Sequence, residues 1–166
     1  GRWLALPLGS LLALAFAPGA QYLLAFACTA ALFVLWHDAG PREAAWRGFL
    51  FTVGTFLAGT YWLFHSIHLI GQAPVWVALL LMLGLVAIMG VYTAIVGYVG
   101  ARWAPGSGAL RWLFLLPAMW VLSEWFRGWF LSGFPWLALG YSQLATSLRG
   151  FAPLLGVYGV SLAAAV

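Results

Sequence analysis

Charged residues are scarce in this chain, and their scarcity excludes most classes of water-soluble protein. Of 166 residues, 6% are charged and 65% are hydrophobic, whereas a typical soluble domain has about 25% charged residues. Lysine is absent, and the seven basic residues are arginines scattered along the sequence. Such a chain could not keep its surface in water. It also has no basic cluster with which to bind nucleic acid.

Cysteine and acidic residues are also rare. Cys28 is the only cysteine, so no disulfide can form within the chain, and its apolar surroundings indicate a small buried hydrophobic residue. The sequence contains no Ser-His-Asp set, no phosphate-binding glycine loop and no metal-ligand cluster. The residues by themselves therefore predict no catalytic set, no metal and no cofactor.

Long apolar runs dominate the sequence instead. A bilayer offers the backbone no hydrogen-bond partner, so a chain within it must form helices or a closed barrel. The run from Val75 to Tyr98 lacks the alternation of barrel strands. We therefore expect an all-α, polytopic transmembrane bundle of about six helices. Breaks where charge, proline and glycine coincide place these helices at 3–17, 20–36, 48–67, 75–100, 112–126 and 152–166.

The arginines indicate an orientation for this bundle. Five of them fall on one side of the predicted helices: Arg2, Arg42, Arg47, Arg102 and Arg111. Because cytoplasmic loops retain positive charge, we expect a cytoplasmic amino terminus. The connection at 127–150 then lies at the outer face. Its aromatic, glycine and small polar residues are typical of a segment within the membrane interface.

Each end of the sequence also allows a prediction. The first apolar run follows one arginine and could be mistaken for a signal peptide, but it leads directly into further apolar runs. We interpret it as a retained first helix. The last run ends in SLAAAV with neither a cap nor a flanking charge, which favours a truncated chain.

Polar candidates gather near the predicted outer face. Glu124 is the only acid within a predicted membrane span, and Arg127 lies one helical turn further on, so we expect the two to pair. The pair either locks the helix end or anchors a lipid headgroup or a neighbouring domain. Tyr61, His65 and His68 share helical spacing, which suits interfacial residues or the polar lining of a lipid entrance. Two histidines without a nearby acid or cysteine make a poor metal site.

Aromatic and small residues mark further positions. Six tryptophans are interpreted as interfacial anchors: Trp3, Trp36, Trp46, Trp76, Trp103 and Trp112. Trp129 and Trp136 instead flank an SGFP turn, in which Gly133 and Pro135 are expected to bend the backbone. Four glycines of the fourth run are expected to permit close helix approach: Gly84, Gly90, Gly97 and Gly100.

Two stretches together form a specific signature. They read PAMWVLSEWFRGWFLSGFPWLALGYSQ, at Pro117 to Gln143, and RGFAPLLGVYGVS, at Arg149 to Ser161. With LAFAP at Leu14 to Pro18 and GTYWLFHSIH at Gly59 to His68, they resemble the membrane portion of the apolipoprotein N-acyltransferase family. The resemblance covers essentially the whole chain.

This resemblance implies an enzyme of the bacterial inner membrane whose functional face is periplasmic. The acyl donor would be a phospholipid, and the acceptor would be the amino group of a diacylated apolipoprotein, with ping-pong acyl transfer between them. The catalytic Glu-Lys-Cys set would lie in a nitrilase-like domain that follows this sequence. No catalytic residue is therefore expected within the chain.

What remains for this chain is to hold the catalytic domain at the bilayer and to admit lipid substrates. The residues expected to bind substrate, around a lip from Gly133 to Tyr141, are Glu124, Arg127, Trp129, Gly133, Phe134, Pro135, Trp136, Tyr141, Tyr61 and His65. One alternative is a non-enzymatic membrane scaffold associated with a polyprenyl-phosphate glycosyltransferase. A transporter is disfavoured, because the polar residues gather near one surface instead of at the membrane midplane.

Overall fold

All regular structure in the described part of the chain is helical. The computed structural model describes residues 1–16, 21–103 and 108–166. Its α-helices are α1 (Ala5–Ala13), α2 (Tyr22–Trp36), α3 (Pro41–Gly59), α4 (Trp62–His65), α5 (Val75–Trp103), α6 (Leu116–Arg127) and α7 (Ala152–Ala165). Short π-helical turns, η2 (Ser66–Ile70) and η3 (Arg111–Leu115), adjoin α4 and α6. The 3-10 turns are η1 (Arg2–Leu4), η4 (Phe130–Ser132), η5 (Leu139–Gln143) and η6 (Ser147–Phe151). The predicted all-α class is confirmed for these residues.

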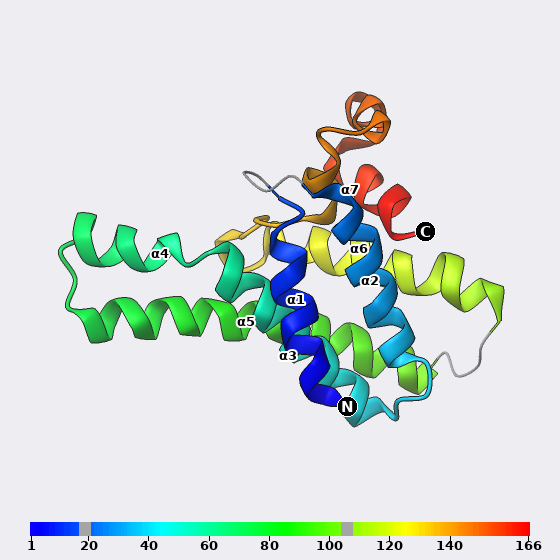
Figure 1. The fold of residues 1–166 in the computed structure, drawn as a ribbon, viewed down its shortest axis with the longest axis horizontal. Helices are drawn as coiled ribbons and strands as arrows, with labels where there is room; N and C mark the ends of the chain where they lie inside the picture. The colour runs from blue at the N-terminus through cyan, green and yellow to red at the C-terminus, as the bar shows by residue number, and fades with distance from the viewer. Residues whose placement is uncertain (17–20, 104–107) are drawn as a thin grey trace.

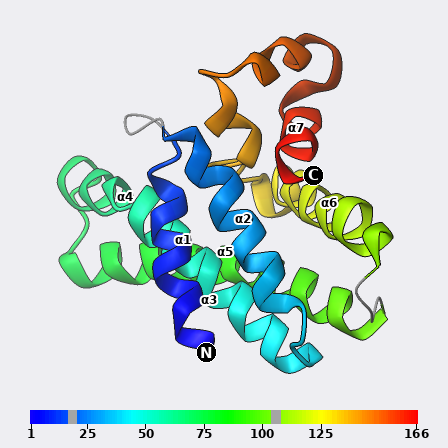
Figure 2. The same cartoon turned by 45° about the vertical axis from the view of Figure 1, so that its right-hand side comes forward.

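Helix α5 runs along the longest dimension of the molecule (Figure 1). Helix α3 packs against it, and α1 packs against α3. Figure 2 shows α2 beside α1, with α7 close to α6. The segment formed by α4 and η2 runs alongside the first half of α5, and the two project together as an arm (Figure 1). Helix α6 lies along the other half of α5.

Glycines bring α3 and α5 into backbone contact. A Cβ placed on Gly97 of α5 would lie 2.5 Å from the carbonyl oxygen of Ala44, and one on Gly48 of α3 would lie 2.5 Å from that of Thr93. Beside these contacts, Thr52 Oγ1 donates a hydrogen bond of 2.7 Å to Thr93 Oγ1. Small residues thus allow close helix approach, and a buried hydroxyl pair fixes the register.

The glycines predicted to serve this purpose do not all do so. Gly90 lies against the ring of Phe49 on α3, where a Cβ would come within 2.8 Å, so it makes room for a side chain and not for the backbone of α3. A Cβ on Gly100 would make an ordinary contact, 3.4 Å from Leu116, and one on Gly84 would meet nothing within 4 Å. Of these four glycines, only Gly90 and Gly97, in the middle and carboxyl-terminal half of α5, lie in close contact with α3.

The stretch predicted as one helix over 48–67 forms two helices. Helix α3 begins at Pro41, since proline suits the first helical turn, and Glu43 lies in that turn. It ends at Gly59 because Thr60 leaves the helical region (φ −127°, ψ 16°), and Thr60 Oγ1 donates to the carbonyl of Phe56 at 2.6 Å. Tyr61 therefore lies beyond α3, and His65 belongs to α4.

Other boundaries shift less. Helix α5 continues past the predicted end at Gly100 to Trp103. Helix α7 is interrupted at Gly156, whose φ of 65° and ψ of −176° are not helical. Helix α1 ends at Ala13, before the predicted residue 17, and residues 14–16 form a turn and a bend. Helix α2 begins at Tyr22, after the predicted residue 20. Pro18 lies outside the described residues.

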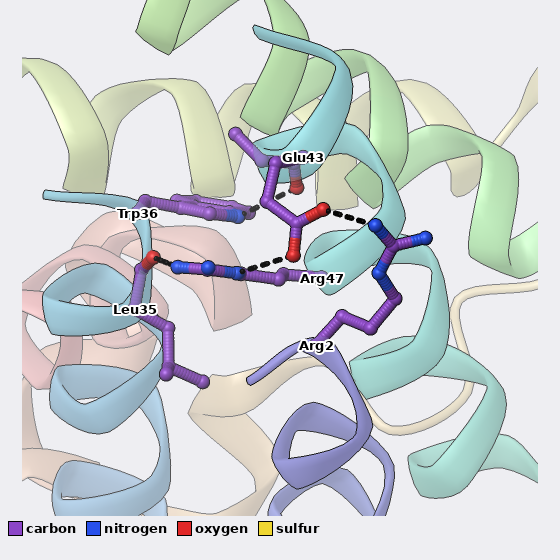
Figure 3. A network of polar contacts seen from close by, with 6 residues as sticks. Arg2, Leu35, Trp36, Glu43 and Arg47 are labelled. Atoms are coloured by element: carbon purple, nitrogen blue, oxygen red, sulfur yellow. Dashed lines mark hydrogen bonds and ion pairs between the residues drawn. The ribbon is translucent and has the colours of Figure 1, made fainter. Parts of the chain in front are cut away.

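Ion pairs and hydrogen bonds tie the amino terminus to α2 and α3 (Figure 3). Glu43 pairs with Arg2 at 3.0 Å and with Arg47 at 3.1 Å, and Arg47 Nη1 donates to the carbonyl of Leu35. Nearby, Arg111 Nη2 donates to the carbonyl of Trp36 at 3.4 Å. Three of the five arginines predicted on one side therefore meet at one end of the molecule.

Trp36 corrects one prediction of an interfacial anchor. Its side chain is 1% exposed, and its Nε1 donates to the carbonyl of Ala44 at 2.8 Å. The ring lies where α2 meets α3, and Gly48 and Gly97 leave room for it. Its apolar body is buried and its N–H is satisfied, so Trp36 is a core residue. By contrast, Trp3, Trp46, Trp76 and Trp103 are exposed.

Among residues 1–16, 21–103 and 108–166, two helical segments are long and apolar enough to cross a membrane. They are Val75–Trp103, with 29 residues and a mean hydropathy of 2.5, and Ser147–Ala165, with 19 residues and a mean hydropathy of 1.3. The segments Arg2–Ala13 and Tyr22–Trp36 are apolar but shorter. That six helices span a bilayer, with a cytoplasmic amino terminus, stays a prediction.

The contact between α3 and α5 can be tested with two glycines of the same helix. We expect Gly97→Ala to destabilise the full-length protein by about 1–3 kcal/mol, because the new methyl group would meet the backbone of α3. Gly84→Ala is the control: its methyl group has open space, and alanine favours the helix. Thermal unfolding in detergent measures both, and equal unfolding temperatures for the two variants would contradict the packing.

Candidate functional site

Glu124 anchors the segment that follows α6. The residue is 2% exposed, and its Oε1 accepts two hydrogen bonds, from Trp120 Nε1 at 2.9 Å and from the backbone N–H of Leu139 at 2.8 Å. Trp120 lies one turn earlier on the same face of α6. Leu139 lies just beyond the GFPW residues 133–136. The carboxylate therefore joins this segment to α6, and it is not exposed to a lipid headgroup.

The same segment is joined to α7 one residue later. The backbone N–H of Gly140 donates to Ser161 Oγ at 2.8 Å. A Cβ on Gly140 would overlap the carbonyl oxygen of Val157, so only glycine permits this approach. Leu139 and Gly140 are both buried. The connection at 127–150 is thus packed against two helices and is not a loose tether.

Arg127 holds the start of the segment and faces a different partner from the one expected. Its backbone carbonyl accepts a hydrogen bond of 2.9 Å from Phe134, and its guanidinium carbon lies 5.2 Å from the centroid of the Phe56 ring. The predicted direct ion pair with Glu124 is not among those found within the described residues. The reason is geometric, because Glu124 turns one oxygen toward Leu139 while Arg127 extends over Phe56 on α3, a cation–π contact.

The predicted bend at Gly133 is present. Gly133 has a φ of +74°, and a Cβ there would overlap the carbonyl oxygen of Gly128. Leu131, Ser132 and Leu137 also adopt positive φ values. Three such residues other than glycine within seven positions are unusual. The hydrogen bonds to Arg127 and Glu124 maintain this conformation.

A row of aromatic rings connects the buried site to the surface. Phe134 lies 6.1 Å from Phe56 and 6.2 Å from Trp136, and Trp136 lies 5.5 Å from Trp62 of α4. Trp136 is 48% exposed. The neighbour of Trp136 is thus Trp62 and not Tyr61, the adjacent residue predicted from the sequence.

The predicted site residues therefore divide into two groups. Glu124, Arg127, Gly133, Phe134 and Trp136 are connected by the contacts above. The second group consists of exposed residues. Trp129 packs on Trp125 and Phe126, and the ring of His65 contacts Phe64. The other exposed residues of this group are Pro135, Tyr141 and Tyr61. Phe56, Leu139 and Ser161 were not predicted as site residues, because their partners lie far away along the chain or on the backbone. Trp120 was not predicted either, although helical spacing places it one turn before Glu124.

An apolar groove lies between α5 and α6. It has a volume of about 690 Å³. Its lining residues are Ile88, Val91, Tyr92, Ile95, Val96, Val99, Met119, Leu122, Ser123, Phe126, Phe130 and Leu131. Only Tyr92 and Ser123 contribute polar groups, so the groove suits an apolar chain.

Chemistry at this site is limited by what the side chains offer. Within the described residues, no group of three or more histidine, cysteine, aspartate or glutamate side chains lies close enough to hold a metal ion. Ser123 donates to the carbonyl of Trp120 at 2.8 Å, and Ser161 accepts from Gly140. Ser161 also hydrogen-bonds the buried carboxyl group of Glu124. The arrangement is suited to binding and positioning.

Comparison with known proteins identifies the family. A model of the apolipoprotein N-acyltransferase N-terminal domain matches residues 8–166. The chain belongs to this family. The resemblance inferred from the EWFRGW and GFPW motifs is thereby confirmed.

Three relatives illustrate the match, and each is named apolipoprotein N-acyltransferase. The protein of Methylococcus capsulatus is 44% identical over 163 residues, which are 98% of this chain and 32% of the relative. That of Coxiella burnetii is 43% identical over 160 residues, 96% of this chain and 33% of the relative. That of Azotobacter vinelandii is 42% identical over 167 residues, 100% of this chain and 32% of the relative. The chain thus spans about a third of the length of these relatives.

The bend at Gly133 can be tested without touching the buried charges. We expect Gly133→Ala in the full-length protein to loosen residues 129–141, because a residue with a Cβ is strained at the φ of 74° and ψ of 136° found here, by about 1–3 kcal/mol, and the methyl group would overlap Gly128. Limited proteolysis should cut this segment faster. Gly150→Ala, which has open space, is the control, and equal cleavage rates in the two variants would contradict the packing described here.

Proposed function

We propose that this chain is the membrane domain of a phospholipid:apolipoprotein N-acyltransferase, in which it anchors the catalytic domain and admits lipid substrates. The observation that carries the proposal is the apolar groove between α5 and α6, which reaches Phe126, Phe130 and Leu131 at the start of the 127–150 connection. Family membership supports it. The scaffold alternative receives no such support, because the relatives above are named as N-acyltransferases.

A membrane location is supported by the surface of α5. Leu79, Leu80, Leu81 and Leu83 are all between 41% and 64% exposed. Consecutive exposed leucines of this kind are costly in water and favourable in lipid. We propose that α5 spans the inner membrane together with the other apolar helices, as a multi-pass bundle.

An orientation with the functional face on the periplasmic side is supported by the two ends of α3. Its first turns contact the arginine cluster around Glu43, whereas Phe56 contacts Arg127 and Phe134. From Glu43 to Phe56, α3 rises by about 20 Å, which separates the arginine cluster from the contacts of Phe56 with Arg127 and Phe134. Positive charge at one end places that end in the cytoplasm. The GFPW residues then lie toward the periplasm, where the catalytic domain would work.

The dimensions of the groove suit one acyl chain. Its α5 residues run from Ile88 to Val99, a rise of about 16 Å. This length is close to the thickness of one leaflet of the hydrocarbon core, about 15 Å. The groove would keep the acyl chain of the phospholipid donor in an apolar environment, with the ester end beside Phe126, Phe130 and Leu131. There the nucleophile of the catalytic domain must come within about 3–3.5 Å of the carbonyl carbon.

Exposed residues beside the groove would form an entrance for lipid substrates. Trp129, Pro135, Trp136 and Tyr141 lie on the 127–150 connection, and Tyr61 and His65 lie at the base of the arm beside it. Amphipathic rings of this type favour the membrane interface. They would contact the headgroup region of the donor and the lipid part of the diacylated apolipoprotein. Gly133 and Phe134, held by Arg127, fix the position of Trp136.

Filling the groove should block the donor. We expect Ile95→Trp in the full-length protein to lower acyl transfer from phospholipids with long acyl chains more than from those with short ones, because a bulky ring would occupy the groove. Leu80→Trp is the control, since Leu80 is exposed on the same helix but does not line the groove. Equal transfer rates for the two variants with a long-chain donor would reject the groove as the acyl site.

Truncating Trp136 should impair transfer at the entrance. We expect Trp136→Ala to reduce acyl transfer at least tenfold without lowering the amount of folded protein in the membrane, because the ring is half exposed and borders the lip. The matched control is Trp46→Ala, with a comparable exposure of 53% at the opposite end of α3. Glu124→Ala is a poorer test, since it would also release Leu139. An unchanged rate of acyl transfer in the Trp136→Ala variant would show that Trp136 is not part of the substrate entrance.

A further inference from the structure

Most of the charged residues of the chain gather at one end of the molecule, around the start of α3. They form a basic end that consists of Arg2, Asp38, Arg42, Glu43, Arg47, Arg102 and Arg111. Figure 3 shows Arg2 and Arg47 both bound to Glu43, and Arg111 Nη2 reaches the carbonyl of Trp36 at the end of α2. Five arginines and two carboxylates give the basic end a net charge of +3, with histidine neutral.

Arg42 and Arg102 belong to this end because α3 and α5 run in opposite directions where they touch. Gly97 of α5 faces the backbone carbonyl of Ala44 on α3, and Thr93 of α5 faces Gly48. Arg42 precedes Ala44 by two residues, and Arg102 follows Gly97 by five. Each therefore lies within about 8 Å, along its helix axis, of the same helix contact.

These two arginines have no partner in the part of the chain that the structure describes. Arg42 and Arg102 are exposed, and neither forms a hydrogen bond or an ion pair with another described residue. A guanidinium group is a planar set of N–H donors that matches the oxygen atoms of a phosphate group. Both side chains are therefore available to an anionic ligand from outside the chain.

Exposed tryptophans accompany three arginines of the basic end, either next in the sequence or one helical turn away. The pairs are Arg2 with Trp3, Arg42 with Trp46, and Arg102 with Trp103. The three rings are 73%, 53% and 74% exposed. Tryptophan favours the headgroup level of a membrane, because its ring is apolar and its N–H is polar. Arginines beside such rings would lie at the level of the lipid phosphates.

We infer that the basic end binds the phosphate groups of anionic phospholipids in the inner leaflet. The guanidinium groups of Arg42 and Arg102 donate hydrogen bonds to phosphate oxygen atoms, and the three tryptophan rings lie between the headgroups and the acyl chains. This site is at the opposite end of α3 from Phe56 and the GFPW residues, so it is distinct from the proposed entrance for substrates. The inference rests on the membrane location and orientation proposed above.

A soluble polyanion fits this surface less well than a bilayer does. It would leave three exposed tryptophan rings in water, whereas lipid covers them. The side chain of Asp38 is 92% exposed and lies 3.6 Å from His37. Its carboxylate repels an anion bound nearby, so it weakens the attraction of the basic end for anionic lipids. Removing this charge should therefore strengthen the binding of such lipids.

Competition between two lipids tests the site in the full-length protein. Micelles would contain equal amounts of phosphatidylglycerol and phosphatidylcholine with the same acyl chains, and native mass spectrometry would give the ratio of the two lipids bound. We expect the wild-type protein to prefer phosphatidylglycerol. The double variant Arg42→Gln, Arg102→Gln should lower this ratio several-fold, because each basic residue near an anionic surface strengthens binding by about fivefold.

Two further variants show where the preference arises. Arg149→Gln is the matched control, because it removes an exposed arginine of the 127–150 connection, and the ratio should stay at the wild-type value. Asp38→Asn should raise the ratio, an opposite change that general damage to the fold would not produce. Equal ratios for the wild type and the double variant would overturn the inference, as would an equal loss in Arg149→Gln.

A soluble competitor separates a lipid site from a site for a free anion. Excess glycerol phosphate should leave the bound lipids in place, and displacement of phosphatidylglycerol by it would overturn the inference. The readout is lipid retention and not acyl transfer. A protein that transfers acyl chains but binds the two lipids equally would refute this inference alone, so its failure and failure of the proposed function are distinguishable.

Discussion

The close contact of α3 with the helices on either side of it is the constraint on which the other features depend. Gly48 and Gly97 bring α3 against α5, and Gly9 and Gly54 do the same between α1 and α3, where added methyl groups would overlap backbone oxygen atoms. In a bilayer, apolar side chains gain little from leaving lipid, so helices associate through close packing and hydrogen bonds. Here small residues allow the close packing, and the Thr52–Thr93 pair forms a hydrogen bond between the helices.

This central packing separates two polar regions that have different character. At one end of α3, Arg2, Glu43 and Arg47 form partly exposed ion pairs, which water and salt weaken. At the other end, Glu124 and Arg127 are buried, and removal of either partner would leave an uncompensated charge. The buried region therefore has the larger influence on structure. It positions the segment that carries Phe134 and Trp136 next to the α5–α6 groove.

Much of the organisation was predictable from the sequence, and the failures have physical causes. Glu124, Arg127 and the bend at Gly133 were identified because an isolated acid in an apolar run and a glycine-proline turn are strong local signals. The direct ion pair was not formed, because helical spacing places two side chains on one face without saying which way each one turns. Trp36 was assigned to the interface because composition cannot distinguish a tryptophan at a helix end from one buried beneath a neighbouring helix. The break at Thr60 was missed because threonine is tolerated in helices, and here its hydroxyl caps the preceding turn.

The sequence by itself determined the all-α class, the apolar character, the family and the location of the candidate site near residues 124–141. These properties depend on composition and on short motifs, which are local along the chain. Only the tertiary structure decided that Leu139 binds Glu124, that Phe56 faces Arg127, that Trp62 accompanies Trp136, and that α5 and α6 enclose a groove. Each of these joins residues from different elements, often through a backbone atom that every residue possesses. Such contacts leave no trace in residue type, because they follow from how closely the helices approach.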